Sequence, residues 1–175
     1  MDKRIRLIEF ETLLLGHYRL SPQHRRTDDP LERSSYLLLS RLRIQGPMSL
    51  RQLSDALGLD VSTLHRQTAT LLSTGLVERI PDPDGGIARK FRVTAAGGQR
   101  LDRERAVIIE VLAAVTQDWT PEERAEFAHY LERFNSDIER LYGRTWPRPD
   151  SSARRSRSGG NHGGIGRVAP ATSST

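Results

Sequence analysis

Residues 49–80 decide the fold, and they read SLRQLSDALGLDVSTLHRQTATLLSTGLVERI. Ser49 with Gln52 three residues later forms a capping box, in which each side chain bonds the other residue's backbone N–H at the start of a helix. The helix opened by this box is short, because Gly58 interrupts it. The stretch therefore begins with a short helix and a glycine turn.

A second helix is predicted from Val61 to about Thr74. Asp60 can cap its N-terminus, and Gly75 can end it in the left-handed conformation that glycine adopts at little cost. Its inward face is expected to carry Leu64, Thr68, Leu71 and Leu72. Two helices joined by a tight turn are typical of a helix-turn-helix, whose second helix lies in the major groove of DNA.

A β-hairpin is predicted directly after the second helix. Residues 76–80 are short and β-prone, and residues 88–93 alternate apolar with polar side chains. Between them, residues 81–86 are rich in proline, aspartate and glycine, which favour turns. A hairpin behind a helix-turn-helix indicates a winged helix-turn-helix.

Two further helices are predicted on the N-terminal side. Residues 4–20 carry apolar side chains on more than one face, which predicts a helix buried on two sides. Asp29 followed by Pro30 is typical of a helix N-cap and first helical position. The helix that this pair would open is expected to end near Gly46.

The C-terminal side of the hairpin predicts two more helices. Thr94 is expected to cap a long helix over about residues 95–116. Thr120 with Pro121 and Glu123 opens a last helix that ends near residue 142. Its apolar stripe consists of Phe127, Tyr130, Leu131, Phe134, Ile138 and Leu141.

The predicted fold class is mainly α with a small β-hairpin wing. Residues 1–142 form one winged helix domain, in which residues 46–97 are the candidate DNA-binding lobe. The outer helices, over about residues 4–20 and 98–142, carry too many apolar side chains to be stable without packing against another surface. Residues 143–175 are rich in glycine, serine and arginine and are predicted to be a disordered basic tail.

The formal net charge of +5 belongs to that tail. Residues 143–175 hold six arginines and one aspartate, whereas residues 1–142 hold 21 basic and 21 acidic side chains. Within the neutral part, residues 41–105 carry +4 and residues 106–142 carry −5. The basic middle of the chain is therefore where an anionic partner is expected to dock.

Several functional classes find no support in the sequence. The chain has no cysteine, which excludes disulfides, thiolate metal sites and cysteine nucleophiles. The five histidines share no metal-ligand spacing, and neither a catalytic constellation nor a cofactor motif is legible. No apolar run is long enough to span a membrane. We therefore expect a cytoplasmic, nucleoid-associated protein that is not an enzyme, binds no metal or cofactor and does not contact membranes.

The candidate DNA contacts lie on the second helix of the helix-turn-helix. Arg66 can bond guanine bidentately, and Gln67 can pair with adenine if it faces outward. Hydroxyl groups near the helix N-terminus can bond phosphate oxygens. The full set predicted on this helix is Ser62, Thr63, His65, Arg66 and Gln67. An ordinary solvated helix face is the alternative for each residue.

Further contacts are predicted on the neighbouring elements. Arg51 and Gln52, early in the first helix of the pair, are candidates for the DNA backbone. On the hairpin, Arg89 and Lys90 are candidates, and Arg89 is favoured because alternate strand residues face the same side.

The sequence resembles the MarR family of bacterial transcription regulators, and four stretches carry the resemblance. They are residues 53–67, 71–79, 82–85 and 93–97. The resemblance implies a homodimer whose outer helices serve as dimerisation helices, with one winged helix per subunit on a palindromic operator. It also implies repression that is often relieved by a small, commonly phenolic, ligand, for which His17, Tyr18 and Tyr36 are the candidate pocket residues here.

One departure from the family concerns the tip of the wing. The family usually carries an arginine there, whereas this chain has Gly85, Gly86 and Ile87. Arg89 could substitute weakly, and the arginine-rich tail could add phosphate contacts. Two functions therefore stay open: a sequence-specific regulator, or a winged helix module that binds DNA without sequence preference or binds proteins.

Overall fold

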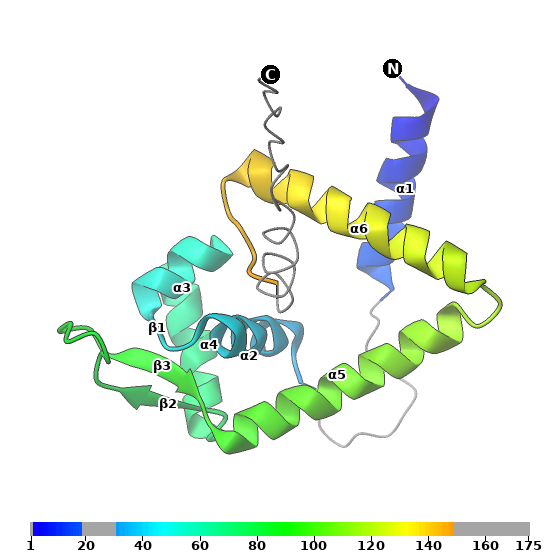
Figure 1. Cartoon of the computed structure of the whole chain (residues 1–175). Helices are drawn as coiled ribbons and strands as arrows, with labels where there is room; N and C mark the ends of the chain where they lie inside the picture. Colours follow the sequence, from blue (N-terminus) through cyan, green and yellow to red (C-terminus); the bar gives the residue numbers. More distant parts are fainter. Residues whose placement is uncertain (1, 19–30, 149–175) are drawn as a thin grey trace, which may run out of the picture.

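The computed structural model describes residues 2–18 and 31–148, and it is built mainly of helices with a small sheet at one side of the fold (Figure 1). The predicted tail beyond residue 148 lies outside the described residues. In chain order the elements are α1 (Lys3–His17), α2 (Arg33–Gln45), β1 (Met48–Ser49), α3 (Leu50–Leu57), α4 (Val61–Ser73), β2 (Val77–Ile80), β3 (Lys90–Val93), α5 (Ala95–Val115) and α6 (Pro121–Tyr142). The mainly helical winged fold predicted from the sequence is confirmed.

The sheet has three antiparallel strands in the order β1-β3-β2. In the wing hairpin, β2 pairs with β3 so that Val77 lies opposite Val93. The hairpin was expected, but β1 was not, because two residues are too few to show strand alternation. Met48 pairs with Phe91, so β1 ties the start of α3 to the wing.

The predicted capping boxes are present. The Gln52 backbone N–H donates to Ser49 Oγ at 3.2 Å, and the Ser49 N–H donates to Gln52 Oε1 at 2.8 Å. Thr120 and Glu123 form the same reciprocal pair at the start of α6. Gly58 ends α3 with φ of 66°, in the left-handed region that favours glycine. Both helix starts follow from side-chain chemistry that the sequence displays.

Two predicted caps are corrected by the structure. Asp60 occupies the N-cap position of α4, but its side chain accepts no capping hydrogen bond. The N-cap of α2 is Glu32, so the helix begins later than an Asp29–Pro30 start would place it. Asp29 and Pro30 themselves lie outside the described residues.

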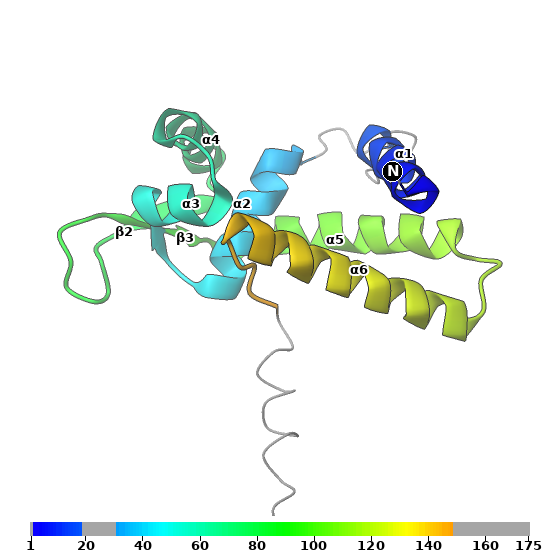
Figure 2. The same ribbon diagram turned by 90° about the horizontal axis from the view of Figure 1, so that it is seen from above.

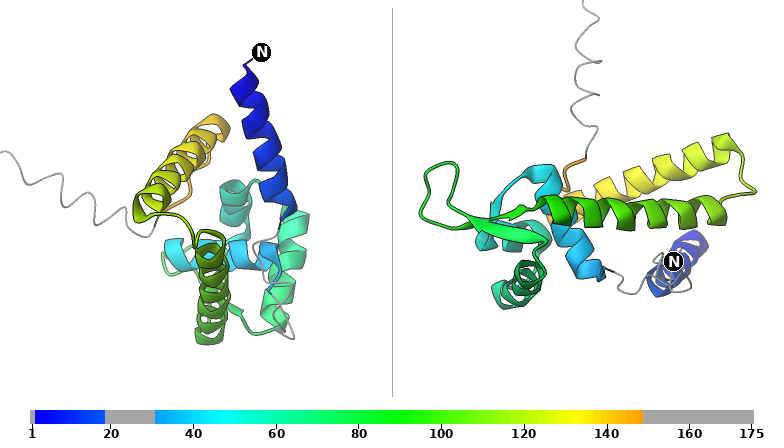
Figure 3. Two further views of the ribbon diagram at one scale, coloured as in Figure 1. Left: turned by 90° about the vertical axis from the view of Figure 1, so that its right-hand side faces the viewer. Right: turned by 90° about the horizontal axis from the view of Figure 1, so that it is seen from below.

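The hydrophobic core lies in a central lobe formed by α2, β1, α3, α4, β2, β3 and the first turns of α5. Its fully buried leucines come from four different helices, as expected when an amphipathic face of each helix points inward. The buried apolar residues are Leu38, Leu39, Leu42, Met48, Leu53, Leu64, Leu71, Val77, Phe91 and Leu101. The views in Figures 2 and 3 show the wing leaving this lobe on the side away from the α5–α6 turn.

The helices outside the lobe leave their apolar faces exposed. Neither α1 nor α6 has a buried residue. The prediction that α1 is buried on two sides is therefore wrong for the single chain, because nothing in the described part of the chain covers it. None of the described helices is long and apolar enough to cross a membrane.

Residues 143–148 correct the predicted boundary of the tail. The sequence assigned them to a disordered segment, but they run from the end of α6 back to the central lobe (Figure 1). The Thr145 carbonyl accepts a hydrogen bond from Arg41 in α2 at 2.9 Å. Trp146 packs against Arg41 there. The average composition of residues 143–175 does not indicate this contact, because it depends on a single aromatic residue.

Candidate nucleic-acid interface

The two faces of α4 separate as the sequence predicted. Leu64, Thr68 and Leu71 are buried, and the Thr68 hydroxyl donates to the Leu64 carbonyl at 2.8 Å. The opposite face is exposed along its length and consists of Val61, Ser62, His65, Arg66 and Ala69. This face combines hydrogen-bonding groups with small side chains, which is what an approach to base edges in the major groove requires.

The N-terminal end of α4 suits an anion. Helix N-termini favour phosphate because their first backbone N–H groups point outward and the helix dipole is positive there. Ser62 is exposed on this first turn, and Thr63 beside it is half-buried. Ser62 is therefore the better placed of the two hydroxyl groups for a phosphate oxygen.

Arg66 and Gln67 differ in their surroundings. Arg66 is exposed, whereas Gln67 is only partly so. The Oε1 atom of Gln67 is buried and has no hydrogen-bond partner among the described residues. The sequence predicts a base contact for Gln67 only if it faces outward, and its partial burial places it at the edge of the exposed face of α4.

The two candidates on α3 also differ. Arg51 is exposed on the first turn. The side-chain oxygen of Gln52 accepts the Ser49 N–H, so this residue caps its own helix. Only its NH₂ group remains to donate to a phosphate.

The wing turn contains an ion cluster centred on Lys90, which corrects the prediction that Lys90 is a DNA contact. The side chain is only 9% exposed, and its Nζ lies 2.6 Å from Asp82 Oδ1 and 2.8 Å from Asp84 Oδ2. The hydrogen bond from Lys90 lowers the pKa of Asp82, and the bonds to Asp82 and Asp84 raise the pKa of Lys90. Lys90 therefore holds the turn, and it is not free to reach DNA.

The same cluster explains the glycines of the wing. A Cβ atom on Gly86 would collide with the Asp82 carboxylate, and Gly85 has φ of 79°. Beyond them, Ile87 is fully exposed at the tip, and Arg89 is exposed just before β3. Near its tip the wing therefore exposes an apolar side chain, Ile87, and a cationic one, Arg89.

The other wing arginines are engaged on the sheet. Arg92 Nη2 pairs with Glu78 Oε1 at 2.9 Å, across the β2–β3 register. The Arg79 guanidinium stacks over Phe91, 5.4 Å from the ring centre. Within the described residues, Arg89 is thus the wing cation that takes part in no ion pair or ring contact.

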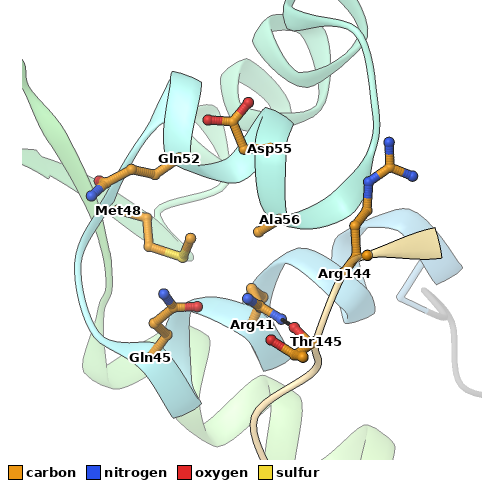
Figure 4. A pocket seen from close by; sticks show the side chains of 9 residues that line it. Arg41, Gln45, Met48, Gln52, Asp55, Ala56, Arg144 and Thr145 are labelled. Carbon is orange, nitrogen blue, oxygen red and sulfur yellow. Dashed lines mark hydrogen bonds between the residues drawn. The ribbon is translucent and has the colours of Figure 1, made fainter. Parts of the chain in front are cut away.

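The three candidate ligand residues are not gathered into one site. His17 and Tyr18 are exposed at the end of α1, with their rings 5.2 Å apart, edge to face. Tyr36 packs half-buried against the core of the central lobe. A pocket of about 310 Å³ lies elsewhere, between α2, α3 and residues 143–145, and includes none of the three (Figure 4).

No group of acidic and histidine side chains suited to a metal ion occurs within residues 2–18 and 31–148.

Comparison with known proteins gives one family model and a curated relative. A family model described as HVO_A0114 matches residues 31–95. An uncharacterized HTH-type transcriptional regulator of Bacillus subtilis (strain 168), YxaD, is 35% identical over 133 residues, which cover 75% of this chain and 92% of the relative.

Solved structures share the fold at lower identity. MarR has a TM-score of 0.67 at 22% identity, over 82% of this chain and 97% of that one. An E. coli MarR mutant in complex with operator DNA has a TM-score of 0.56 at 20% identity, over 77% and 99% of the two chains. PcaV of Streptomyces coelicolor, solved with its natural ligand, has a TM-score of 0.54 at 22% identity, over 74% and 90%.

Proposed function

The chain belongs to the MarR family of winged helix-turn-helix transcription regulators, and from this premise we propose that it is a homodimeric, sequence-specific DNA-binding repressor. The proposal rests on the exposed face of α4, with Ser62, His65 and Arg66 opposite a fully buried apolar face. An E. coli neighbour of the same fold was solved on operator DNA, which supports DNA as the partner. Such a regulator works by binding and performs no catalysis.

The exposed apolar faces support a second copy of the chain as the partner of the outer helices. Monomeric soluble proteins rarely leave large contiguous apolar patches uncovered. Here the exposed side chains of α1 and α6 include Ile5, Leu7, Ile8, Phe10, Leu13, Phe127, Tyr130, Phe134 and Ile138. A symmetric dimer would bury these faces and place two copies of α4 on one side, as a palindromic operator requires.

Relief of repression by a small ligand completes the proposal. PcaV, a neighbour in fold, was solved with its natural ligand. For this chain we propose a small phenolic or amphipathic inducer, with Tyr36 as the best placed of the predicted pocket residues because it is half-buried beside the lobe core. A protein with this role acts in the cytoplasm, where the DNA lies.

Selection of binding sites from a random-sequence duplex library by the full chain tests the proposal. The expected result is an enriched palindrome, with half-sites centred about 10 base pairs apart. Light scattering of the same sample should give twice the chain mass of 19.7 kDa. Enrichment of no sequence, or a monomer mass on the selected duplex, would contradict the proposed function.

The second candidate, a winged helix module without sequence preference, is favoured by the wing alone. Its tip carries Ile87 in place of the family's arginine, so this wing offers no cation at the tip for the minor groove. The same selection separates the two candidates, because a non-specific binder would retain DNA without enriching any sequence.

A further inference from the structure

The C-terminal strap, residues 143–148, closes a triangle in the fold. In Figure 1, α5 leaves the central lobe, α6 returns, and the strap, drawn in orange, runs from the end of α6 to the lobe. The far corner is held by Arg124, whose Nη2 donates to the Thr116 carbonyl at 2.7 Å, and by Trp119 packed edge to face on Phe127. At the other end of α6, the strap connects the helix to the central lobe.

At that corner the strap supplies the contacts of a buried cation. Arg41, in α2, is only 6% exposed. Its Nη1 donates to the Thr145 carbonyl at 2.9 Å, and its guanidinium lies over the Trp146 ring, 5.0 Å from the ring centre (Figure 4 shows the hydrogen bond). Burial lowers the pKa of Arg41, and the charge of Glu139 partly offsets this. Without the strap, Arg41 would lose this hydrogen bond and this ring contact, and the charge of Glu139 in α6 would be left to offset its burial.

Two more contacts fix the ends of the strap. Arg144 lies against Gly58, the turn between α3 and α4, so closely that a Cβ atom there would collide with its guanidinium. Arg148 reaches back to α6, where its Nη2 and Nη1 donate to the Glu139 carboxylate at 2.8 and 3.2 Å. These hydrogen bonds from Arg148 lower the pKa of Glu139. The strap thus contacts α6, α2 and the helix-turn-helix turn within six residues.

We propose that the strap is a positioning element for DNA binding, and that the contact between Arg41 and Trp146 fixes the direction of α6 relative to α4. Since α6 has no buried residue among the described ones, its direction depends strongly on the α5–α6 turn and on the strap at its two ends. The contacts at the α5–α6 turn and along the strap would then keep the direction of α6 constant. The inference rests on the proposed dimer: when α6 joins the two subunits, the strap sets the separation of the two α4 helices and therefore the half-site spacing.

A distance measurement tests this without DNA. The chain has no cysteine, so Ala69→Cys, on the exposed face of α4, takes one spin label per subunit. Pulsed electron resonance should give a narrow distribution of distances between the two α4 helices. Trp146→Ala should broaden it, and Trp146→Phe, which keeps an aromatic face for Arg41, should restore it. Equally narrow distributions in all three proteins would overturn the proposal.

The second readout is the affinity for DNA. It uses the duplex selected by the wild-type chain and two variants of it, in which two base pairs are inserted into or deleted from the spacer between the half-sites. A rigid dimer should lose on the order of 10²-fold in affinity on the altered duplexes, because both half-sites cannot be engaged at once. In Trp146→Ala this spacing penalty should fall by about tenfold, while the affinity for an isolated half-site stays unchanged. An unchanged spacing penalty would overturn the strap proposal.

Controls separate this proposal from the proposed function and from misfolding. A wild-type chain that selects no site refutes the dimeric regulator and the strap with it, whereas a wild-type dimer that selects a palindrome but shows no spacing penalty refutes the strap proposal alone. Thermal unfolding checks that Trp146→Ala is folded. Arg148→Gln loosens the strap at its α6 end, outside the lobe core, and should reduce the spacing penalty in the same direction. If Trp146→Ala does not fold, an unchanged penalty in Arg148→Gln overturns the proposal.

Discussion

Replacing Arg66 with alanine tests the assignment of α4 most informatively. Arg66 is exposed, and among the described residues its side chain makes no ion pair or hydrogen bond. Alanine has the highest helix propensity, so Arg66→Ala should leave the free energy of unfolding nearly unchanged. The loss should therefore be confined to the complex with DNA.

The magnitude follows from the geometry of the contact. A guanidinium that bonds guanine through two N–H groups contributes about 1–3 kcal/mol of discrimination. At 25 °C this corresponds to an affinity loss of about 5- to 150-fold on the selected duplex. Binding to random DNA should weaken less, because only the phosphate attraction is common to all sequences.

Fluorescence anisotropy provides the assay, with the selected duplex, single-base variants of it and a random duplex. Arg66→Lys should keep the salt dependence and lose base discrimination, because lysine lacks the planar fork. Arg103→Ala, which removes one exposed arginine from α5, is the matched control and should change neither quantity. An equal loss of affinity for Arg66→Ala on every duplex would refute base reading by this residue.

Three other predictions concern the core and the wing. Leu64→Ala, at a fully buried position of α4, should lower the free energy of unfolding by about 2–5 kcal/mol in urea titrations, and a loss below about 1 kcal/mol would contradict the packing described. Ile87→Arg should steepen the slope of log affinity against log salt by about 1, since it adds one phosphate-reaching cation at the wing tip; an unchanged slope would mean that the tip does not touch DNA. Lys90→Met should destabilise the wing. Because Lys90 lowers the pKa of Asp82, this stabilisation is present above the ordinary carboxyl pKa of about 3.9 and is lost as the pH falls through the lower folded value. The difference in urea midpoint between wild type and Lys90→Met should thus be constant near neutral pH and shrink in acid; a difference that grows in acid would contradict the ion cluster.

Local side-chain chemistry made much of the fold predictable. The capping boxes at Ser49 and Thr120 and the glycine turn at Gly58 depend on residues within a few positions of each other. The 3.6-residue period of α4 is also a local feature, and it correctly predicts that Leu64 is buried and Arg66 exposed. Features determined by short-range bonds or by one helix face are visible in a single sequence.

What the sequence missed depends on contacts between distant residues. Strand alternation predicts a DNA contact at Lys90, because it indicates on which side of the strand a residue lies and does not show that Asp82 and Asp84 fold back onto it. The role of Trp146 depends on Arg41, more than 100 positions away, and composition alone placed residues 143–148 in a tail. The two-residue strand β1 exists only because β3 lies beside it.

The most direct test of the account is a hydroxyl-radical footprint of the full chain on its selected duplex. An α4 helix in the major groove of each half-site, in a dimer with one fixed separation, predicts two protected stretches related by two-fold symmetry. Their centres should lie about 10–10.5 base pairs apart, or a multiple of that distance. Uniform protection, or a single unsymmetrical stretch, would contradict the claim that this chain reads DNA as a dimer through α4.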